Sequence, residues 1–216
     1  MYKAASLILR EREINFFTKY VRGYRMIKFV VSVLGLCLAI SFAAFSQDID
    51  TLISKANAGD SFSQIELGLI YENGRGVTKD YSEAVKWYRK SAEQGDATGQ
   101  RNLGFMYSKG RGVTQNYSEA VTWYRKSAEQ GDAIGQRNLG FMYEEGRGVT
   151  QDYSEAVKWY RKSAEQGDAT GQSYLGDMYE YGKGVSKDYT EAEKWYRKAA
   201  EQGNSIAKIG LERLSQ

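Results

Sequence analysis

The 216-residue chain has no histidine, no proline and a single cysteine, Cys37. Without histidine, it has no imidazole acid or base and no histidine metal ligand. Residues 47–216 contain no cysteine either, so this part lacks a thiolate nucleophile and a thiolate ligand. The missing proline fits helices joined by glycine turns, and the chain has 23 glycines. We therefore expect a non-enzymatic protein without a cofactor or a metal site.

The formal net charge of +3 arises from the N-terminal part of the chain. Residues 1–46 hold 7 basic and 2 acidic residues, which leaves 23 basic and 25 acidic residues in 47–216. A nucleic-acid-binding surface needs a concentrated basic patch. The balanced remainder predicts no nucleic-acid partner.

Residues 29–45 form a run of 17 residues without a charge. Preceded by Met26 and Lys28, the run is typical of a signal peptide that is cut ahead of Gln47. Translation would then start at Met26, and residues 1–25 would be an upstream over-extension.

Translation from Met1 predicts a different fate for the same run. Seven basic residues would precede it and retain it as an uncleaved membrane anchor, although 17 residues is the short limit for a span. A buried core helix fits poorly, because the run is apolar on all sides. Both export interpretations place the rest of the chain outside the cytoplasm, secreted or periplasmic, and a membrane is a partner only if the segment stays uncleaved. Lipidation of Cys37 is not expected, since Leu36 stands where a small residue is needed.

A 36-residue unit recurs four times, at 60–95, 96–131, 132–167 and 168–203. The second and third copies are identical at 31 of 36 positions. A period of this length indicates supersecondary units that stack side by side, because one unit cannot bury its apolar face alone.

Each unit contains two apolar runs whose residues are spaced by three and four, which predicts two amphipathic helices. In the second unit these runs carry Ala97, Leu103, Gly104, Met106 and Tyr107, then Tyr117, Ala120, Val121, Trp123, Tyr124 and Ala128. Aromatic residues at helical spacing indicate core. We therefore expect the Trp-Tyr pair of each unit to form a repeating buried spine.

Polar residues and glycines mark the helix ends. Asn116 is a favourable N-cap for the second helix, and Glu119 follows at the spacing of a capping box. Gly131 suits the left-handed position after that helix, and Asp132 would cap the next one. Equivalent residues recur in the other copies.

Two further glycine positions recur in every copy. Gly104 lies in the middle of a helix, where glycine costs about 1 kcal/mol relative to alanine, so its repetition predicts a close approach of two helices. Residues 110–113 read Gly-Arg-Gly-Val. We interpret them as a flexible bend with Val113 in the core, since a phosphate-binding loop would need a preceding strand and a following Lys-Ser/Thr.

The unit matches the pattern Ala-x5-Leu-Gly-x2-Tyr-x2-Gly-x-Gly-Val-x3-Tyr-x2-Ala-x2-Trp-Tyr-x3-Ala-x2-Gly, which residues 97–131 fit throughout. The chain therefore resembles the Sel-one-like repeat (SLR) family, a relative of the tetratricopeptide repeats, over roughly residues 48–216. The resemblance implies an all-α fold, a right-handed α-solenoid of antiparallel helix pairs, and a role as scaffold or adaptor. One envelope-associated branch with disulfide-stapled repeats has been linked to β-lactam binding, but the repeats of this chain contain no cysteine.

Partial copies flank the four units and predict terminal capping helices, which brings the expected number of helices to about ten. In the C-terminal copy, Lys208, Glu212 and Arg213 are expected to face the solvent. The expected segments are 1–25 (upstream extension), 26–46 (signal peptide or anchor), 47–59 (N-terminal cap), the four repeats 60–95, 96–131, 132–167 and 168–203, and 204–216 (C-terminal cap).

Two short patterns are compatible with catalysis but are weak. Ser205 and Lys208 have the Ser-x-x-Lys spacing of penicillin-recognising enzymes, yet the partner motifs Ser-Asp-Asn and Lys-Thr-Gly are absent. Glu144 and Glu145 are adjacent carboxylates, which we interpret as a solvated helix end.

Positions that differ between nearly identical repeats are not fixed by packing and can encode a ligand. The differences concentrate in the first helix, which lines the concave face of the related tetratricopeptide solenoid. By that resemblance the partner-binding candidates are Arg101, Asn102, Phe105, Lys109, Arg137, Asn138, Phe141, Tyr174, Asp177 and Tyr181.

The central candidates combine arginine and asparagine with phenylalanine, which predicts a site for a short acidic peptide or an acidic chain terminus. Alternatively, Arg101 and Arg137 pair with neighbouring acids, and Phe105 and Phe141 are partly core. We expect an exported scaffold that binds a protein or peptide on its concave face. The alternatives are a β-lactam-binding or peptidoglycan-related envelope enzyme and a purely structural spacer.

Overall fold

The computed structural model describes residues 49–215, which form ten helices and no strand. The chain divides into two compact units between Thr51 and Leu52, and all the repeats lie in the second unit. The predicted signal peptide or anchor, the alternative start sites and Cys37 lie outside the described residues. Within the described part, no helix has both the length and the apolar character needed to cross a bilayer.

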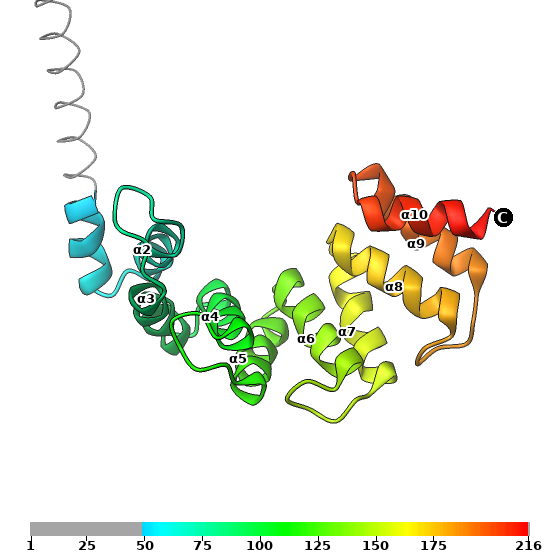
Figure 1. Cartoon of the computed structure of the whole chain (residues 1–216), viewed down its shortest axis with the longest axis horizontal. Helices are drawn as coiled ribbons and strands as arrows, with labels where there is room; N and C mark the ends of the chain where they lie inside the picture. The colour runs from blue at the N-terminus through cyan, green and yellow to red at the C-terminus, as the bar shows by residue number, and fades with distance from the viewer. Residues whose placement is uncertain (1–48, 216) are drawn as a thin grey trace, which may run out of the picture. The chain divides into compact units, whose positions relative to one another are not determined.

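Helix pairs follow one another in a single row through the second unit (Figure 1). Residues 49–57 are helical and precede the first pair. The pairs are α2 (Ser61–Asn73) with α3 (Tyr81–Glu93), α4 (Ala97–Lys109) with α5 (Tyr117–Glu129), α6 (Ala133–Glu145) with α7 (Tyr153–Glu165), and α8 (Ala169–Tyr181) with α9 (Tyr189–Glu201), after which α10 (Ser205–Leu214) ends the row. The predicted helical solenoid is confirmed.

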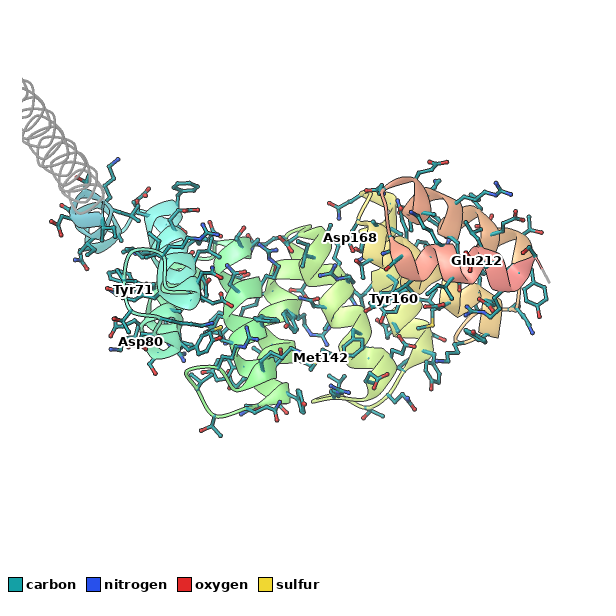
Figure 2. The ribbon with its side chains drawn as sticks, turned by 45° about the horizontal axis from the view of Figure 1, so that its top comes forward. Tyr71, Asp80, Met142, Tyr160, Asp168 and Glu212 are labelled. Carbon is teal, nitrogen blue, oxygen red and sulfur yellow. The ribbon has the colours of Figure 1, made fainter. Side chains whose placement is uncertain are left out.

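The helix ends follow the predicted caps, with one change. Asp80 accepts hydrogen bonds from the N–H groups of Ser82 and Glu83, as an N-cap should. A full capping box would also need the Glu83 carboxylate to accept from the Asp80 N–H. That N–H instead donates to the Tyr71 carbonyl at 2.9 Å, while Glu83 pairs with Lys86. Figure 2 labels Tyr71 and Asp80. The same N–H to carbonyl bond recurs in each repeat and joins its two helices.

Glycines at the middle of the first helices allow close contact with the second helices, as predicted. A Cβ atom on Gly104 would lie 2.8 Å from the Tyr124 ring and 3.2 Å from the Ala120 carbonyl oxygen. Both distances are shorter than ordinary van der Waals contact. The helix-propensity cost of glycine is therefore offset by packing of the tyrosine ring against bare backbone.

The core is continuous along the row because each cluster of buried residues spans two repeats. One cluster joins Tyr88 of α3, Leu103 and Met106 of α4, and Trp123 of α5. The next two clusters repeat this arrangement, and Figure 2 marks their members Met142 and Tyr160 among the helices. The predicted aromatic spine is confirmed: the tryptophans of the second, third and fourth repeats pack against the repeat before their own, and Trp87 packs against Ala56 of the N-terminal helix.

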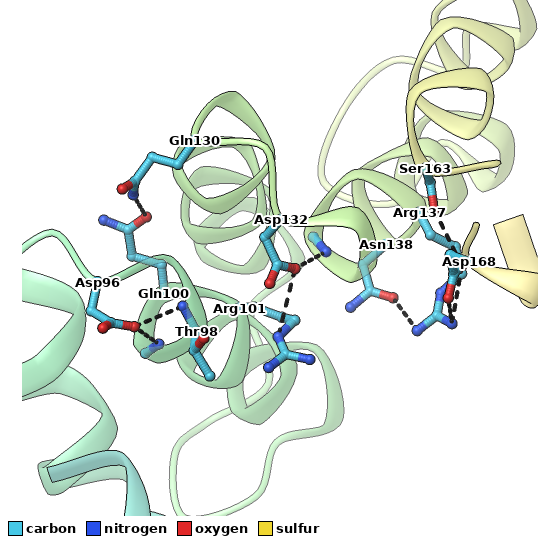
Figure 3. A network of polar contacts seen from close by, with 12 residues as sticks. Asp96, Thr98, Gln100, Arg101, Gln130, Asp132, Arg137, Asn138, Ser163 and Asp168 are labelled. Atoms are coloured by element: carbon cyan, nitrogen blue, oxygen red, sulfur yellow. Dashed lines mark hydrogen bonds and ion pairs between the residues drawn. The ribbon is translucent and has the colours of Figure 1, made fainter. Parts of the chain in front are cut away.

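A ladder of glutamine side chains, which was not predicted from the sequence, also connects the repeats. Gln100 is buried and donates to the Ala92 carbonyl at 3.3 Å. Its Oε1 accepts from Gln130 of the same repeat at 2.8 Å (Figure 3), and the Gln130 amide also reaches the Gly95 carbonyl of the preceding repeat. Buried amides need such partners, so the ladder fixes the spacing of neighbouring repeats.

The terminal helices bury one face against the repeats. Ala56 lies in a cluster with Leu67 and Trp87 at the N-terminal end, and Ala207 of α10 packs in a cluster with Tyr196 of α9. Arg213 is exposed, as expected. Its guanidinium also pairs with Glu180 of α8 at 2.5 Å, because that glutamate is buried and needs a charged partner.

Candidate functional site

The ten candidate residues all lie on first helices, but the structure divides them into three groups. Two arginines form ion pairs with helix caps, a middle group lines a pocket, and a third group lies near the C-terminal end. Asn102 is half-buried on α4 and belongs to none of these.

The arginines of the second and third repeats pair with acids of the repeat that follows each of them. Arg101 lies 3.7 Å from Asp132, and Arg137 lies 3.4 Å from Asp168 (Figure 3). Both aspartates are N-caps, of α6 and α8. Arg137 also donates to Asn138 at 3.4 Å. The structure thus shows Arg101 and Arg137 paired with neighbouring acids, which was the alternative interpretation. A role of these arginines in ligand binding stays a prediction.

Replacing Arg137 should affect stability only slightly. We expect Arg137→Ala to lower the free energy of unfolding by about 1 kcal/mol or less, because a long, partly solvated ion pair contributes little. Asp168→Ala should cost more, since it also removes the cap of the Gly171 N–H at 2.7 Å. Urea unfolding of both variants measures the two losses in the free energy of unfolding. Equal losses would show that the arginine matters more to the fold than its geometry indicates.

A pocket of about 140 Å³ lies between the second and third repeats, where α4, α5 and α6 meet. Four candidates line it: Phe105, Lys109, Asn138 and Phe141. The remaining lining residues were not among the sequence candidates; they are Ser108, Tyr117, Tyr124, Met142 and Arg147. Variation between repeats could have identified Ser108, because its position differs from repeat to repeat. It could not have identified the other four, because they belong to the framework that all repeats share.

The walls of the pocket combine aromatic rings with positive charge. The Arg147 guanidinium lies 5.4 Å from the Phe141 ring centre, and the Lys109 ammonium lies 6.0 Å from that of Phe105. At these distances a cation is attracted to the ring face. Tyr124 is buried, and burial raises the pKa of its hydroxyl to about 12, so the hydroxyl stays protonated at neutral pH and can donate a hydrogen bond. This combination suits an anionic group attached to an apolar one.

The candidates of the fourth repeat belong to a separate cluster. Asp177 accepts a hydrogen bond from Tyr196 at 2.6 Å, and burial raises the pKa of its carboxyl. Burial acts in the same direction on Glu180, but hydrogen bonds from Arg213 and Tyr196 outweigh it and hold the pKa of Glu180 below its usual range. The Arg213 guanidinium also covers the ring of the exposed Tyr181. These contacts hold α10 against α8 and α9.

Tyr174 links the two regions through its ring. It stacks on Phe141 with ring centres 6.5 Å apart and tilts against Tyr160 at 5.2 Å. Phe105 and Phe141 themselves are half-buried and pack against the core clusters. The phenylalanines therefore form both pocket wall and interface core, as the alternative interpretation allowed.

Of the residues considered for catalysis, Ser205, Lys208 and Glu145 are exposed. Glu144 was expected at a solvated helix end but is half-buried, because its carboxylate accepts a hydrogen bond from the buried Tyr160. Ser205 and Lys208 lie on the first turns of α10, away from the pocket between the second and third repeats. Among residues 49–215, no group of three or more metal-ligating side chains is placed to hold an ion.

Comparison with known proteins places these repeats in a family. Sel1 repeats match residues 61–96, 97–132, 133–168 and 169–204, which together cover two thirds of the chain. The secretory immunoglobulin A-binding protein EsiB of Escherichia coli is 46% identical over 62 residues, which is 28% of this chain and 13% of EsiB.

Two solved structures resemble the fold closely. A protective antigen of uropathogenic Escherichia coli strains, which displays an SLR fold, gives a TM-score of 0.71 at 47% identity and covers 74% of this chain and 34% of its own. A Sel1 repeat protein from Oxalobacter formigenes gives a TM-score of 0.67 at 42% identity, covering 71% of this chain and 61% of its own. This chain therefore spans less than two thirds of the length of each of these relatives. With four matching repeats across two thirds of its residues, the chain belongs to the Sel1 repeat family.

Proposed function

We propose that this protein is an exported scaffold that binds a protein or peptide partner through the surface formed by its first helices. Sel1 repeats typically serve as scaffolds for protein–protein interactions. The observation that carries the proposal here is the pocket between α4 and α6, where aromatic walls and two cations meet. Aromatic anchors of this kind supply most of the binding energy of protein interfaces.

The arrangement of the helices supports the first-helix surface as the binding side. Neighbouring first helices contact one another along the row, α2 with α4, α4 with α6, and α6 with α8. Elements that approach each other in this way line the inner side of a curved stack. The concave face is therefore the proposed location, and the pocket its centre.

Export is proposed from the uncharged residues 29–45 and their basic flank. Two relatives, one named as an immunoglobulin-binding protein and one as a protective antigen, are compatible with a role outside the cytoplasm. An acidic partner is proposed because Lys109 forms no ion pair with the described residues and stands at the rim of the pocket.

A crosslinking pull-down from the envelope fraction of the source cells tests this function with the full-length protein. We expect wild type to capture a defined partner and Phe105→Ala/Phe141→Ala to capture it at least about tenfold less, as loss of aromatic anchors should cause. Leu69→Ala, at the equivalent position of the first repeat, is the matched control and should behave as wild type.

A second variant separates binding from folding. Lys109→Glu changes an exposed residue and should leave the far-UV circular dichroism unchanged while it weakens capture of an acidic partner. If the phenylalanine variant and Lys109→Glu both capture as well as wild type, the first-helix surface is not the binding site and the proposal is wrong.

A further inference from the structure

One position of the repeat differs in a way that the pocket explains. The residue twelve places after the N-cap of the first helix is glutamate in three repeats, namely Glu72, Glu144 and Glu180, but it is Ser108 in the second. In those three repeats the carboxylate accepts a hydrogen bond from the buried tyrosine of the second helix. The distances are 2.8 Å for Tyr88, 2.8 Å for Tyr160 and 2.6 Å for Tyr196.

The same three carboxylates also hold a cation from a later segment of the chain. Glu72 lies 3.5 Å from Arg111, and Glu144 lies 3.2 Å from Lys183; both cations come from the glycine turn of the next repeat. At the C-terminal end, where no further turn follows, Arg213 of α10 takes this place at Glu180. The glutamate thus joins a buried hydroxyl to a positive charge at each of these junctions.

The junction after the second repeat has the donor and the cation but no carboxylate from this position. Among residues 49–215, the Tyr124 hydroxyl has one hydrogen-bond partner, the Ser108 hydroxyl at 3.3 Å. The turn cation, Arg147, pairs with Glu145 of its own repeat at 3.4 Å, and both side chains are more than two fifths exposed. Such an exposed pair contributes little and exchanges readily. This junction is where the pocket opens.

The chemistry around Ser108 is complementary to a carboxylate. The Tyr124 hydroxyl can donate to a ligand in place of its long bond to Ser108, and the Ser108 hydroxyl can do so when it rotates away from the Phe105 carbonyl, to which it donates at 2.8 Å. Arg147 and Lys109 supply positive charge beside them. Hydrogen bonds to a charged carboxylate are stronger than hydrogen bonds between neutral groups. Phe105, Phe141 and Met142 form an apolar wall next to these donors. A peptide C-terminus presents both features at once, a carboxylate and an adjacent side chain.

We propose that the pocket at Ser108 binds the C-terminal carboxylate of a partner peptide, in the place that a glutamate carboxylate occupies in the other three repeats. This inference rests on the proposed function and names its ligand group. The carboxylate accepts from Tyr124 and Ser108 and pairs with Arg147 and Lys109, while the last side chain of the peptide packs against Phe105 and Phe141. The second repeat is thereby specialised, and the other three are closed by their own glutamates.

Propionate, which matches the glutamate side chain from its β-carbon outward, is the probe for the carboxylate site. We expect it to raise the Tm of the full-length wild type relative to chloride at equal ionic strength, because a ligand that binds only the folded state stabilises it. Propionamide should not do so. Ser108→Glu should raise the Tm without any ligand, by at least about 2 °C for a protein of this size, and should abolish the response to propionate.

Two further variants test the site, and the second keeps the test decisive even if Ser108→Glu folds poorly. Glu144→Ser places a serine beside Tyr160 and Lys183 at the next junction, so in the Ser108→Glu background it should restore a response to propionate. Arg147→Gln removes the cation without changing the core and should reduce the wild-type response. A wild type that does not respond, or one whose response survives in both Ser108→Glu and Arg147→Gln, overturns the proposal.

The peptide source is tested by calorimetry with three probes. The peptide Gly-Ser-Gly-Ser-Leu with a free C-terminus should bind more tightly than its C-terminal amide, and Ser108→Glu should remove the difference. An amidated peptide carrying an internal glutamate that binds as tightly as the free acid would overturn the C-terminal assignment. If these tests fail but the pull-down still depends on the phenylalanines, the scaffold function stands and only the carboxylate site is wrong. If wild type captures no partner but still responds to propionate, the carboxylate site stands and the scaffold function is wrong.

Discussion

Gly148→Ala is expected to lower the free energy of unfolding by about 2–5 kcal/mol, which combines backbone strain with a steric clash. Gly148 has a φ of 73°, and a Cβ atom there would lie 2.4 Å from both the carbonyl carbon and the oxygen of Tyr117. These are backbone atoms of the preceding repeat, at the start of α5, and they cannot rotate away. The substitution should therefore push two repeats apart.

Chemical denaturation of the full-length protein measures this loss, and Gly131→Ala is its control. Gly131 has a φ of 91°, but a Cβ atom there would meet nothing within 4 Å. Gly131→Ala should lower the free energy of unfolding only by the strain of the left-handed conformation, about 1–2 kcal/mol. If both variants lost the same stability, the contact between the turn and the preceding repeat would not matter to the fold.

Trp159→Ala is expected to cost about 3–5 kcal/mol, the range seen when a large buried aromatic side chain is removed. Trp159 is 8% exposed and packs with Val121 and Tyr124 of the preceding repeat and with Leu139 of its own. Its indole Nε1 has no hydrogen-bond partner among the described residues. The loss therefore reflects packing and the Lys162 ammonium 4.1 Å from the ring centre, not a hydrogen bond, and it falls on the interface that couples two repeats.

In a linear array of repeats, a weak central interface also reduces cooperativity. We expect the urea transition of Trp159→Ala to broaden or to split into two steps. Trp159→Phe, which keeps an aromatic ring, should lose much less stability and remain a single transition. Lys158→Ala, on the exposed neighbouring position, should change little. A sharp, wild-type-like transition in Trp159→Ala would show that the tryptophans do not couple the repeats.

The sequence by itself determined the repeat, its two helices and their ends. These features depend on interactions within a few residues of one another: apolar spacing sets the helix faces, and a side chain such as Asp80 or Asn116 caps the N–H groups two or three places later. The mid-helix glycine could be interpreted as well, because a locally costly residue that recurs four times needs a compensating contact. Near-identical copies made each of these signals visible four times over.

Only the tertiary structure decided which charges meet across repeats. Arg101 and Arg137 have the composition of a ligand clamp, yet each lies beside a cap of the following repeat, about thirty residues away in the chain. The substitution of Ser108 for glutamate was visible in the sequence. The consequence of that substitution was not visible in the sequence, because the tyrosine and the turn cation that the glutamate joins come from two other elements. Pairing over such distances depends on how the helices stack, and a linear pattern does not contain that geometry.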